Sequence, residues 1–312
     1  MKTVVSYLSV LIFVSMLLAP SEGRGSGNIS VESDARFRLE ERGELDPELH
    51  LLGLSLRHTF ADRRGDRLIL FGLARAEQDL SEVMLHELYA RYKGSLGSWD
   101  LTAGRFRLPY GLMYSFDAAT LLYDTPHEDL LGMDSDNGVM ISGIAGPLDY
   151  SLSITQGYGH HSPGFPGHGI ATARLGIMPG DTEEITIGIS GAYGKSSTPH
   201  HGDTAVERAL TGADATLYLG RWLIRIEMSA GTVDGRSILA GFAGIDYALM
   251  PGLDMNLSSN ILRHGPNTTD TWLAGLTWRP RWLTIRGGYR YVGQNDSHGF
   301  TIQAYHLFSR GF

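Results

Sequence analysis

Apolar and polar residues alternate with a period of two along most of the chain. In residues 28–40 every even position is polar or charged. The apolar residues of this segment all occupy odd positions: Ile29, Val31, Ala35, Phe37 and Leu39. A helix would mix the two kinds on each of its faces, whereas a β-strand separates them because successive side chains point to opposite sides. The pattern therefore predicts a strand with one apolar and one polar face.

About sixteen segments follow this alternation, and no helical segment of convincing length interrupts them. Residues 67–77 are the least regular, because 68–73 are apolar on both faces. We expect an all-β chain of about sixteen strands, within a range of roughly 14 to 18. The predicted strands lie near residues 28–40, 48–60, 67–77, 83–93, 98–106, 138–145, 149–158, 169–178, 184–194, 207–219, 221–231, 237–249, 252–263, 270–279, 282–292 and 299–312.

The connections between these segments alternate between short and long. The short ones are 94–98, 146–149, 179–183, 220–221, 251–252 and 280–281. The longer ones are 107–137, 159–168, 195–206, 264–270 and 294–298. Outer-membrane barrels join their strands by short periplasmic turns and longer external loops, so the alternation favours a transmembrane antiparallel β-barrel. A secreted β-sandwich or β-helix with buried aromatic residues is the alternative.

Tryptophan placement agrees with a membrane barrel. Trp99, Trp222, Trp278 and Trp282 all lie beside predicted short turns. Aromatic girdles occupy this position at the boundary between lipid and water. The even number of strands would return both ends of the chain to the periplasmic side.

The N-terminal residues have the pattern of an export signal. A basic start at Met1-Lys2 precedes a largely apolar run over 4–18, and Ser21-Glu22-Gly23 offers a small-x-small cleavage site. We therefore predict a cleaved signal peptide over residues 1–23 and a single barrel domain over 24–312. The predicted location is the outer membrane of a bacterial cell.

Composition excludes several kinds of chemistry. The chain has 312 residues, 40 of them glycine, and contains no cysteine, so it has no disulfides, thiolate metal sites or covalently attached haem. The net charge of −8 argues against a nucleic-acid partner. We expect no cofactor.

Two stretches carry a resemblance to a known family. Residues 88–94 and 101–112, which include Pro109-Tyr110-Gly111, resemble Gram-negative porins and are closest to the phosphate-selective porin O/P-like families. The resemblance implies a water-filled channel for small hydrophilic solutes or ions, narrowed by a third external loop that folds inward. The loop over 107–137 has that place and length. Lysine occurs only at Lys2, Lys93 and Lys195, so phosphate specificity is not carried over; an anion path would use arginine.

The same resemblance covers the end of the chain and its surroundings. Phe312 closes an aromatic last strand, similar to the assembly signal that the barrel-assembly machinery of Gram-negative bacteria recognises. Porins of this size contact outer-membrane lipid and lipopolysaccharide, and they are often homotrimers.

The charges expected at the channel form two groups. The first is a set of carboxylates in the long loop, which has no Lys or Arg between Leu108 and Asp136: Asp117, Asp124, Glu128, Asp129, Asp134 and Asp136. The second is a set of arginines that the alternation places on the inner wall: Arg36, Arg38, Arg91, Arg174, Arg225, Arg286 and Arg290. An acidic loop opposite wall arginines would set a transverse field across a narrow aqueous path. The alternative is that the carboxylates cap turns or pair with nearby arginines.

Two further functions compete with a channel, and the loop histidines raise a separate question. A porin-like barrel could act as the sleeve of a multihaem cytochrome in an electron conduit across the outer membrane, although an inward loop would occupy the space that the cytochrome needs. An outer-membrane hydrolase or protease could use Ser258, Ser259, His264 and Asp270, but no motif of nucleophile and base supports this. The loop histidines His160, His161, His168, His200 and His201 could bind a divalent metal, or could simply be solvated. We predict no enzymatic activity and no metal site.

Overall fold

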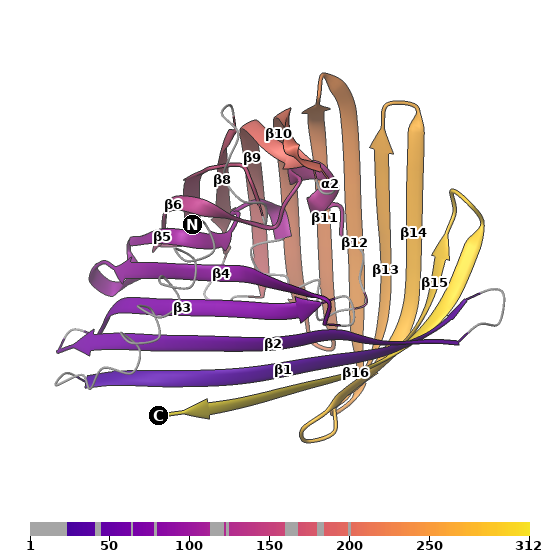
Figure 1. Ribbon diagram of the computed structural model, residues 1–312, viewed down its shortest axis with the longest axis horizontal. Coiled ribbons are helices and arrows are strands. Elements are labelled where there is room, and N and C mark those ends of the chain that lie inside the picture. The colour runs from indigo at the N-terminus through magenta and orange to yellow at the C-terminus, as the bar shows by residue number, and fades with distance from the viewer. Residues whose placement is uncertain are drawn as a thin grey trace.

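The chain folds into a closed β-barrel (Figure 1). The computed structural model describes residues 24–40, 45–63, 65–77, 80–112, 122, 125–159, 168–179, 184–198 and 201–312, so the predicted signal peptide lies outside the described residues. Each strand pairs antiparallel with its neighbours in sequence, and β1 pairs with β16. The strands are β1 Arg24–Glu40, β2 Leu45–Asp62, β3 Gly65–Glu77, β4 Glu82–Lys93, β5 Asp100–Arg107, β6 Ser135–Ala145, β7 Leu148–Thr155, β8 Gly169–Ile177, β9 Ile185–Thr198, β10 His201–Leu219, β11 Trp222–Val233, β12 Arg236–Met250, β13 Leu253–His264, β14 Asn267–Trp278, β15 Thr284–Val292 and β16 Ser297–Gly311. The prediction of an antiparallel barrel of about sixteen strands is confirmed.

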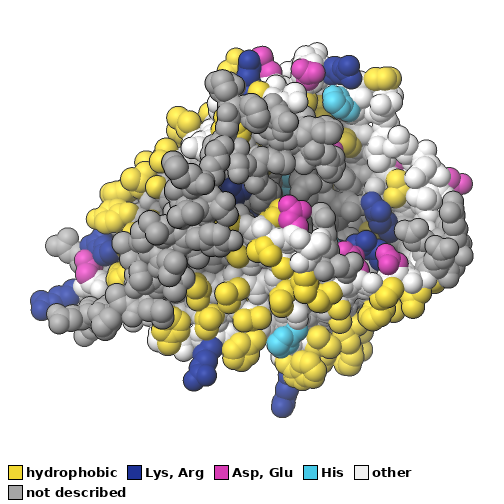
Figure 2. Space-filling model, in the orientation of Figure 1, with side chains coloured by type: hydrophobic (Ala, Val, Ile, Leu, Met, Phe, Trp, Pro, Cys, Tyr) yellow, Lys and Arg dark blue, Asp and Glu magenta, His cyan; other side chains and the backbone are white. Residues whose placement is uncertain are grey.

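Alternation along each strand divides the barrel into an apolar outer face and a polar inner face. On β1, Val31 and Phe37 are 40% and 44% exposed, whereas Glu32 and Asp34 between them are 7% and 0% exposed. Large exposed apolar side chains gather on the outer surface, with Lys and Arg side chains projecting beyond them (Figure 2). The near and far walls cross steeply, as tilted strands do in a closed barrel (Figure 1).

Tight turns and exposed tryptophans mark one end of the barrel. Gly220 and Gly252 have φ angles of +62° and +80° in two-residue turns, a conformation that glycine adopts without steric cost. The Trp222 and Tyr247 rings lie against each other at a tilt of 41°, with centroids 4.4 Å apart. The exposed fractions of the girdle residues are 41% for Trp99, 44% for Trp222, 52% for Trp278 and 70% for Trp282.

The opposite end differs from the prediction. Of the five connections expected to be long, the one between β5 and β6 and the one between β7 and β8 remain long. The connection expected over 195–206 is instead mostly strand, since β9 continues to Thr198 and β10 begins at His201. Lys195 and Glu207 face each other across this hairpin, so pairing continues where hydrophobic alternation ends. The pattern marks only the lipid-facing part of a strand, and it therefore misses polar extensions beyond the membrane.

The barrel closes between its first and last strands. β1 and β16 pair in one register from Asn28 opposite Gly311 to Glu40 opposite Gly299. Beyond this ladder, the backbone N–H of Gly27 donates to the Phe312 carbonyl at 2.8 Å, and the Phe312 N–H donates to the Gly27 carbonyl at 2.9 Å. The terminal aromatic residue therefore supplies the last two hydrogen bonds of the closing seam.

Two short helices lie within the described residues, η1 Ser95–Gly97 and α2 His127–Leu131. No helix among them is long and apolar enough to cross a membrane. The α2 helix belongs to the connection between β5 and β6 and contacts β9 and β10.

Candidate channel and constriction

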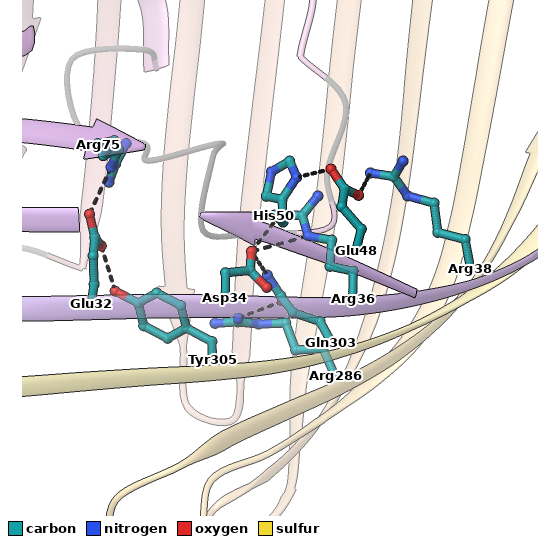
Figure 3. A network of polar contacts seen from close by, with 10 residues as sticks. All are labelled: Glu32, Asp34, Arg36, Arg38, Glu48, His50, Arg75, Arg286, Gln303 and Tyr305. Carbon is teal, nitrogen blue, oxygen red and sulfur yellow. Dashed lines mark hydrogen bonds and ion pairs between the residues drawn. The ribbon is translucent and has the colours of Figure 1, made fainter. Parts of the chain in front are cut away.

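The inner surface near the closing seam carries a network of paired charges (Figure 3). Glu32 on β1 accepts hydrogen bonds from Arg75 Nε on β3 at 2.7 Å and from the Tyr305 hydroxyl on β16 at 2.9 Å. Arg75 is 2% exposed and Glu32 is 7% exposed, so this ion pair is largely removed from water. It joins the two sides of the seam from within the barrel.

A second group continues the network two residues along β1 (Figure 3). Asp34 accepts hydrogen bonds from Arg36 at 2.8 Å and from the side-chain amide of Gln303 on β16 at 2.7 Å. Gln303 in turn accepts one from Arg286 on β15 at 2.8 Å. An arginine of β15 and a carboxylate of β1 are thereby connected through a neutral amide.

Two β-bulges add histidine–glutamate pairs to the same side of the barrel. His50 is the extra residue of a bulge in β2, and its Nδ1 lies 3.0 Å from Glu48, which also binds Arg38 at 2.8 Å. His86 is the extra residue of a bulge in β4, with its Nε2 2.9 Å from Glu77. The extra residue of a bulge has no partner in the ladder, and here its side chain is directed toward a glutamate.

The other side of the barrel is also lined by ion pairs. Arg174 on β8 binds Asp149 at 2.7 Å and Asp214 at 2.6 Å. Arg225 on β11 binds Asp246 on β12 at 3.0 Å. Arginines on both sides of the barrel thus have carboxylate partners, so wall charge alone does not give the channel a single sign.

The described residues of the connection between β5 and β6 lie inside the barrel and are anchored to the inner wall. The backbone N–H groups of Gly111 and Leu112 donate to Ser190 Oγ on β9 at 2.9 Å and to Glu227 Oε2 on β11 at 2.8 Å. His127 Nε2 lies 2.9 Å and 3.0 Å from the two oxygens of the same Glu227 carboxylate. Glu227 is 1% exposed. One wall carboxylate therefore holds two separate points of this connection.

The α2 helix is held by a buried arginine of β10. The Arg208 guanidinium donates to the carbonyl oxygens of Leu130 at 2.5 Å and Asp129 at 3.0 Å, and to Ser196 Oγ at 2.6 Å. Ser196 Oγ donates to the Leu131 carbonyl at 2.7 Å. A cation beside the last carbonyl groups of a helix satisfies acceptors that have no partner within the helix.

Apolar side chains seal this contact. Tyr110 is fully buried, and burial raises the pKa of its hydroxyl to about 12, so it remains uncharged in neutral solution. Each fully buried large apolar side chain contributes about 1.5–3 kcal/mol. The cluster consists of Leu108, Tyr110, Leu130, Leu131 and Met133 from the connection and Ile170, Ala192, Val206, Leu210, Val233, Ile238 and Ala240 from the wall.

The structure describes part of the predicted acidic group. Asp117 and Asp124 lie outside the described residues, as does the side chain of Glu128. Asp129 is exposed in the middle of α2, and Asp134 is partly buried. The Arg208 contact with the Asp129 carbonyl holds this part of the helix in place.

Asp136 differs from the prediction that it lines the channel. Its side chain is 0% exposed. Its carboxylate accepts hydrogen bonds from the backbone N–H groups of Gly157 and Gly159, and the Gly159 carbonyl accepts one from Arg105 at 2.6 Å. Asp136 therefore caps the start of the β7–β8 connection, which was the alternative interpretation for these carboxylates.

The predicted wall arginines lie on the inner face, where each of them makes a polar, charged or ring contact. Besides the pairs described above, Arg91 donates from Nε to Thr102 at 3.1 Å and lies 5.1 Å from the centroid of the Tyr89 ring. Arg290 is exposed on the inner face, where it pairs in register with Leu273. Their placement fits the alternation, whereas their partners could not be predicted from it.

Sequence analysis missed the residues that fix the inner connection. The alternation places Glu227 on the inner face of its strand, but nothing in the sequence indicates a bond to His127, which is 100 residues away. The contacts of Arg208 and Tyr110 could not be predicted either, because their partners are also distant along the chain. Arg75 lies in the segment with apolar residues on both faces, where the alternation was weakest.

The structure offers no grouping for metal binding or hydrolysis among the described residues. Within the described ranges no three His, Cys, Asp or Glu side chains lie together in a way that could hold a metal ion. Of the loop histidines, His160, His161 and His200 lie outside the described residues, as does the His201 side chain. Ser258 and His264 are six positions apart on one extended strand, about 20 Å, so they cannot form a nucleophile–base pair.

Comparison with known proteins supports the fold. No family model matches the sequence, and no curated protein matches it. Among solved structures, the chain is similar to an anion-selective porin from Comamonas acidovorans, with a TM-score of 0.70, 10% identity and coverage of 92% of this chain and 100% of that one. It is also similar to OmpF from Salmonella typhi, with a TM-score of 0.69, 10% identity and coverage of 90% and 97%. OmpT of Vibrio cholerae gives a TM-score of 0.65 at 11% identity, covering 93% of this chain and 99% of that one. The fold is thus that of outer-membrane porins.

Proposed function

We propose that the protein is a porin of the bacterial outer membrane, through which small hydrophilic solutes and ions diffuse passively. One observation carries this proposal: an apolar outer face encloses a charged inner face in a barrel of sixteen strands. Barrels of sixteen to eighteen strands are wide enough for an aqueous channel. The connection anchored on Glu227 narrows this channel from inside.

Location and assembly follow from the same proposal. Residues 1–23 would direct export and be removed, and the outer membrane with its lipopolysaccharide would surround the apolar face. A similar structure is described as a trimer form of Vibrio cholerae OmpT, and Comamonas acidovorans supplies one described as anion-selective. We propose a homotrimer on this likeness. A relation to the phosphate-selective porin O/P-like families remains an expectation from the sequence. We propose no specificity for phosphate for this protein.

Conductance in planar bilayers tests the proposal directly. The purified protein should produce stepwise currents on the order of hundreds of picosiemens in KCl, as a porin-sized aqueous lumen would. The sign of the reversal potential in asymmetric KCl gives the ion preference. A folded protein that inserts without any conductance step would contradict the channel function.

The electron-conduit sleeve is less consistent with the interior of this barrel. A sleeve needs a lumen that a cytochrome can fill, whereas Leu108, Tyr110 and α2 pack against the inner wall of this one.

A further inference from the structure

Two aromatic side chains lie side by side on the inner wall of β3 and β4. Phe71 and Tyr89 are directly paired in register, and alternation places them on the same face as Arg75 and Arg91. Their ring centroids are 5.3 Å apart, with the ring planes tilted by 35°. Both side chains are only partly buried. The interior of a channel-forming barrel is polar, so passive diffusion of ions does not explain an aromatic pair at this position.

The aromatic pair lies between two arginines. Arg57 on β2 pairs in register with Phe71, and the guanidinium carbon of Arg91 lies 5.1 Å from the centroid of the Tyr89 ring. Arg57 is exposed, and within the part of the chain that the structure describes it makes no hydrogen bond or ion pair. Arg91 donates to the neutral hydroxyl of Thr102 at 3.1 Å. These two positive charges therefore differ from those of the seam network, which are bonded to carboxylates.

The surroundings of Arg57 on the inner wall are neutral. Its other partner in register is Asn28 on β1, and the inner positions before and after it on β2 are a serine and a threonine. On β4 the carboxylate of Glu87 is bonded to Arg107 at 3.2 Å. The apolar cluster of the inner connection lies across the barrel, on β8 to β12. The row therefore combines an exposed positive charge with an adjacent aromatic surface.

We propose that Arg57, Phe71, Tyr89 and Arg91 form a binding site on the channel wall for aromatic anions, meaning solutes in which a planar ring carries a sulfonate or carboxylate. The anionic group would bind the Arg57 guanidinium, whose planar N–H groups match two oxygens. The ring would pack on the aromatic pair in an offset or edge-to-face arrangement. Arg91 holds the Tyr89 ring and adds positive potential. The site rests on the proposed channel function, because such solutes reach it through the lumen.

Three probes separate the contribution of the charge from that of the ring. Benzenesulfonate carries both, methanesulfonate carries only the anion, and benzyl alcohol carries only the ring. With the wild-type protein in planar bilayers, benzenesulfonate should reduce the open-channel current at concentrations about tenfold lower than either of the other two. Equal block by methanesulfonate, or equal block by benzyl alcohol, would overturn the site.

Two variants test the residues of the site. Arg57→Gln removes the positive charge and keeps a polar side chain, whereas Phe71→Leu keeps an apolar side chain and removes the ring. The first should raise the half-blocking concentration of benzenesulfonate about tenfold and the second about fivefold. Retained heat-modifiable gel mobility would show that each variant is folded.

Arg290→Gln is the control for the charge change. Arg290 is also exposed on the inner face, but it lies on β15, which β16 and β1 separate from β2. Its substitution changes only the general field of the lumen, so the half-blocking concentration should stay within about twofold of the wild-type value. Unchanged block in Arg57→Gln and Phe71→Leu, or a rise in Arg290→Gln equal to that in Arg57→Gln, would overturn the site.

Binding measured by calorimetry on detergent-solubilised protein separates the site from the channel. Conductance without benzenesulfonate binding would reject the site and leave the channel function intact. Benzenesulfonate binding that depends on Arg57 and Phe71, in a protein that shows no conductance, would reject the channel function and retain the site.

Discussion

Individual charged residues on the inner wall act through their partners. Glu32 and Asp34 are nearly or fully buried although they face the lumen, because Arg75, Tyr305, Arg36 and Gln303 surround them. A carboxylate that is bonded in this way contributes little free charge to a passing ion. It contributes instead to holding adjacent strands in register.

The Glu32 contacts predict a measurable effect on stability. Glu32→Ala removes a buried ion pair to β3 and a hydrogen bond to β16, so it should lower the free energy of unfolding by about 2–4 kcal/mol. Urea unfolding of the protein in lipid vesicles measures this difference.

Tyr305→Phe provides the comparison for this prediction. It removes only the hydroxyl that donates to Glu32 and should cost about 1 kcal/mol. In the double variant the loss of the hydroxyl should have no further effect, because its acceptor is already gone. Fully additive losses would show that the two side chains are not coupled.

Among the structural elements, the connection between β5 and β6 controls the shape of the lumen. Its first part is tied to Glu227 through the Leu112 N–H, and its helical part is tied to Glu227 through His127. Arg208 and the apolar cluster hold α2 independently of that carboxylate. The connection is therefore held at two places. The anchor at Glu227 depends on this single side chain, whereas the anchor at α2 does not.

Loss of the Glu227 anchor should loosen the constriction without unfolding the barrel. Glu227→Ala leaves the Leu112 N–H without its acceptor and His127 without its partner. We expect increased open-channel current noise and several-fold faster protease cleavage within the connection. Single-channel recordings and limited proteolysis measure these effects.

Asp149→Asn is the matched control for Glu227→Ala. It removes a carboxylate that binds Arg174 on the inner wall and does not contact the connection. Its current noise should equal that of the wild type. Unchanged noise in Glu227→Ala as well would mean that Arg208 and the apolar cluster suffice to hold the element.

The acidic part of the same element gives a prediction about ion preference. Replacing Asp124, Glu128 and Asp129 by their amides should shift the permeability ratio toward anions, because three of the loop's six negative charges would be removed. The reversal potential in asymmetric KCl measures the ratio. An unchanged potential would show that these carboxylates do not face the permeation path.

At the scale of the whole molecule, the sixteen strands form one closed sheet. No single strand could satisfy its own backbone hydrogen-bonding groups in lipid. A closed barrel leaves no strand edge unpaired, which lipid surroundings require because no water is present to satisfy backbone groups. The seam between β1 and β16 completes this closure. Its final hydrogen bonds come from Phe312.

Phe312 should therefore matter in two separable ways. Phe312→Ala keeps both backbone hydrogen bonds to Gly27 but removes the ring, so refolding in detergent should be close to wild type while assembly in cells falls several-fold. Deletion of Phe312 also removes the hydrogen bonds and should impair both. The folded fraction on unheated gels measures each outcome, and normal assembly of Phe312→Ala in cells would contradict the role of the ring as an assembly signal.

The sequence alone determined the approximate number of strands, their order and the direction in which their side chains face. A strand that separates lipid from water must alternate apolar and polar side chains. The pattern from Ile29 to Leu39 therefore shows directly which side chains face lipid and which face the lumen. The alternation is lost where neither face of a strand meets lipid, so it did not predict the extensions of β9 and β10. It was also weak near Arg75, because the inner wall there includes the buried apolar side chains of Ile69 and Leu73.

Only the tertiary structure decided how the lumen is shaped. His127 meets Glu227, and Arg208 meets the carbonyl end of α2, because the barrel brings together segments some 100 and 80 residues apart in sequence. Local alternation reports which side of the wall a residue faces. The partner across the lumen depends on closure and register, which no local pattern encodes.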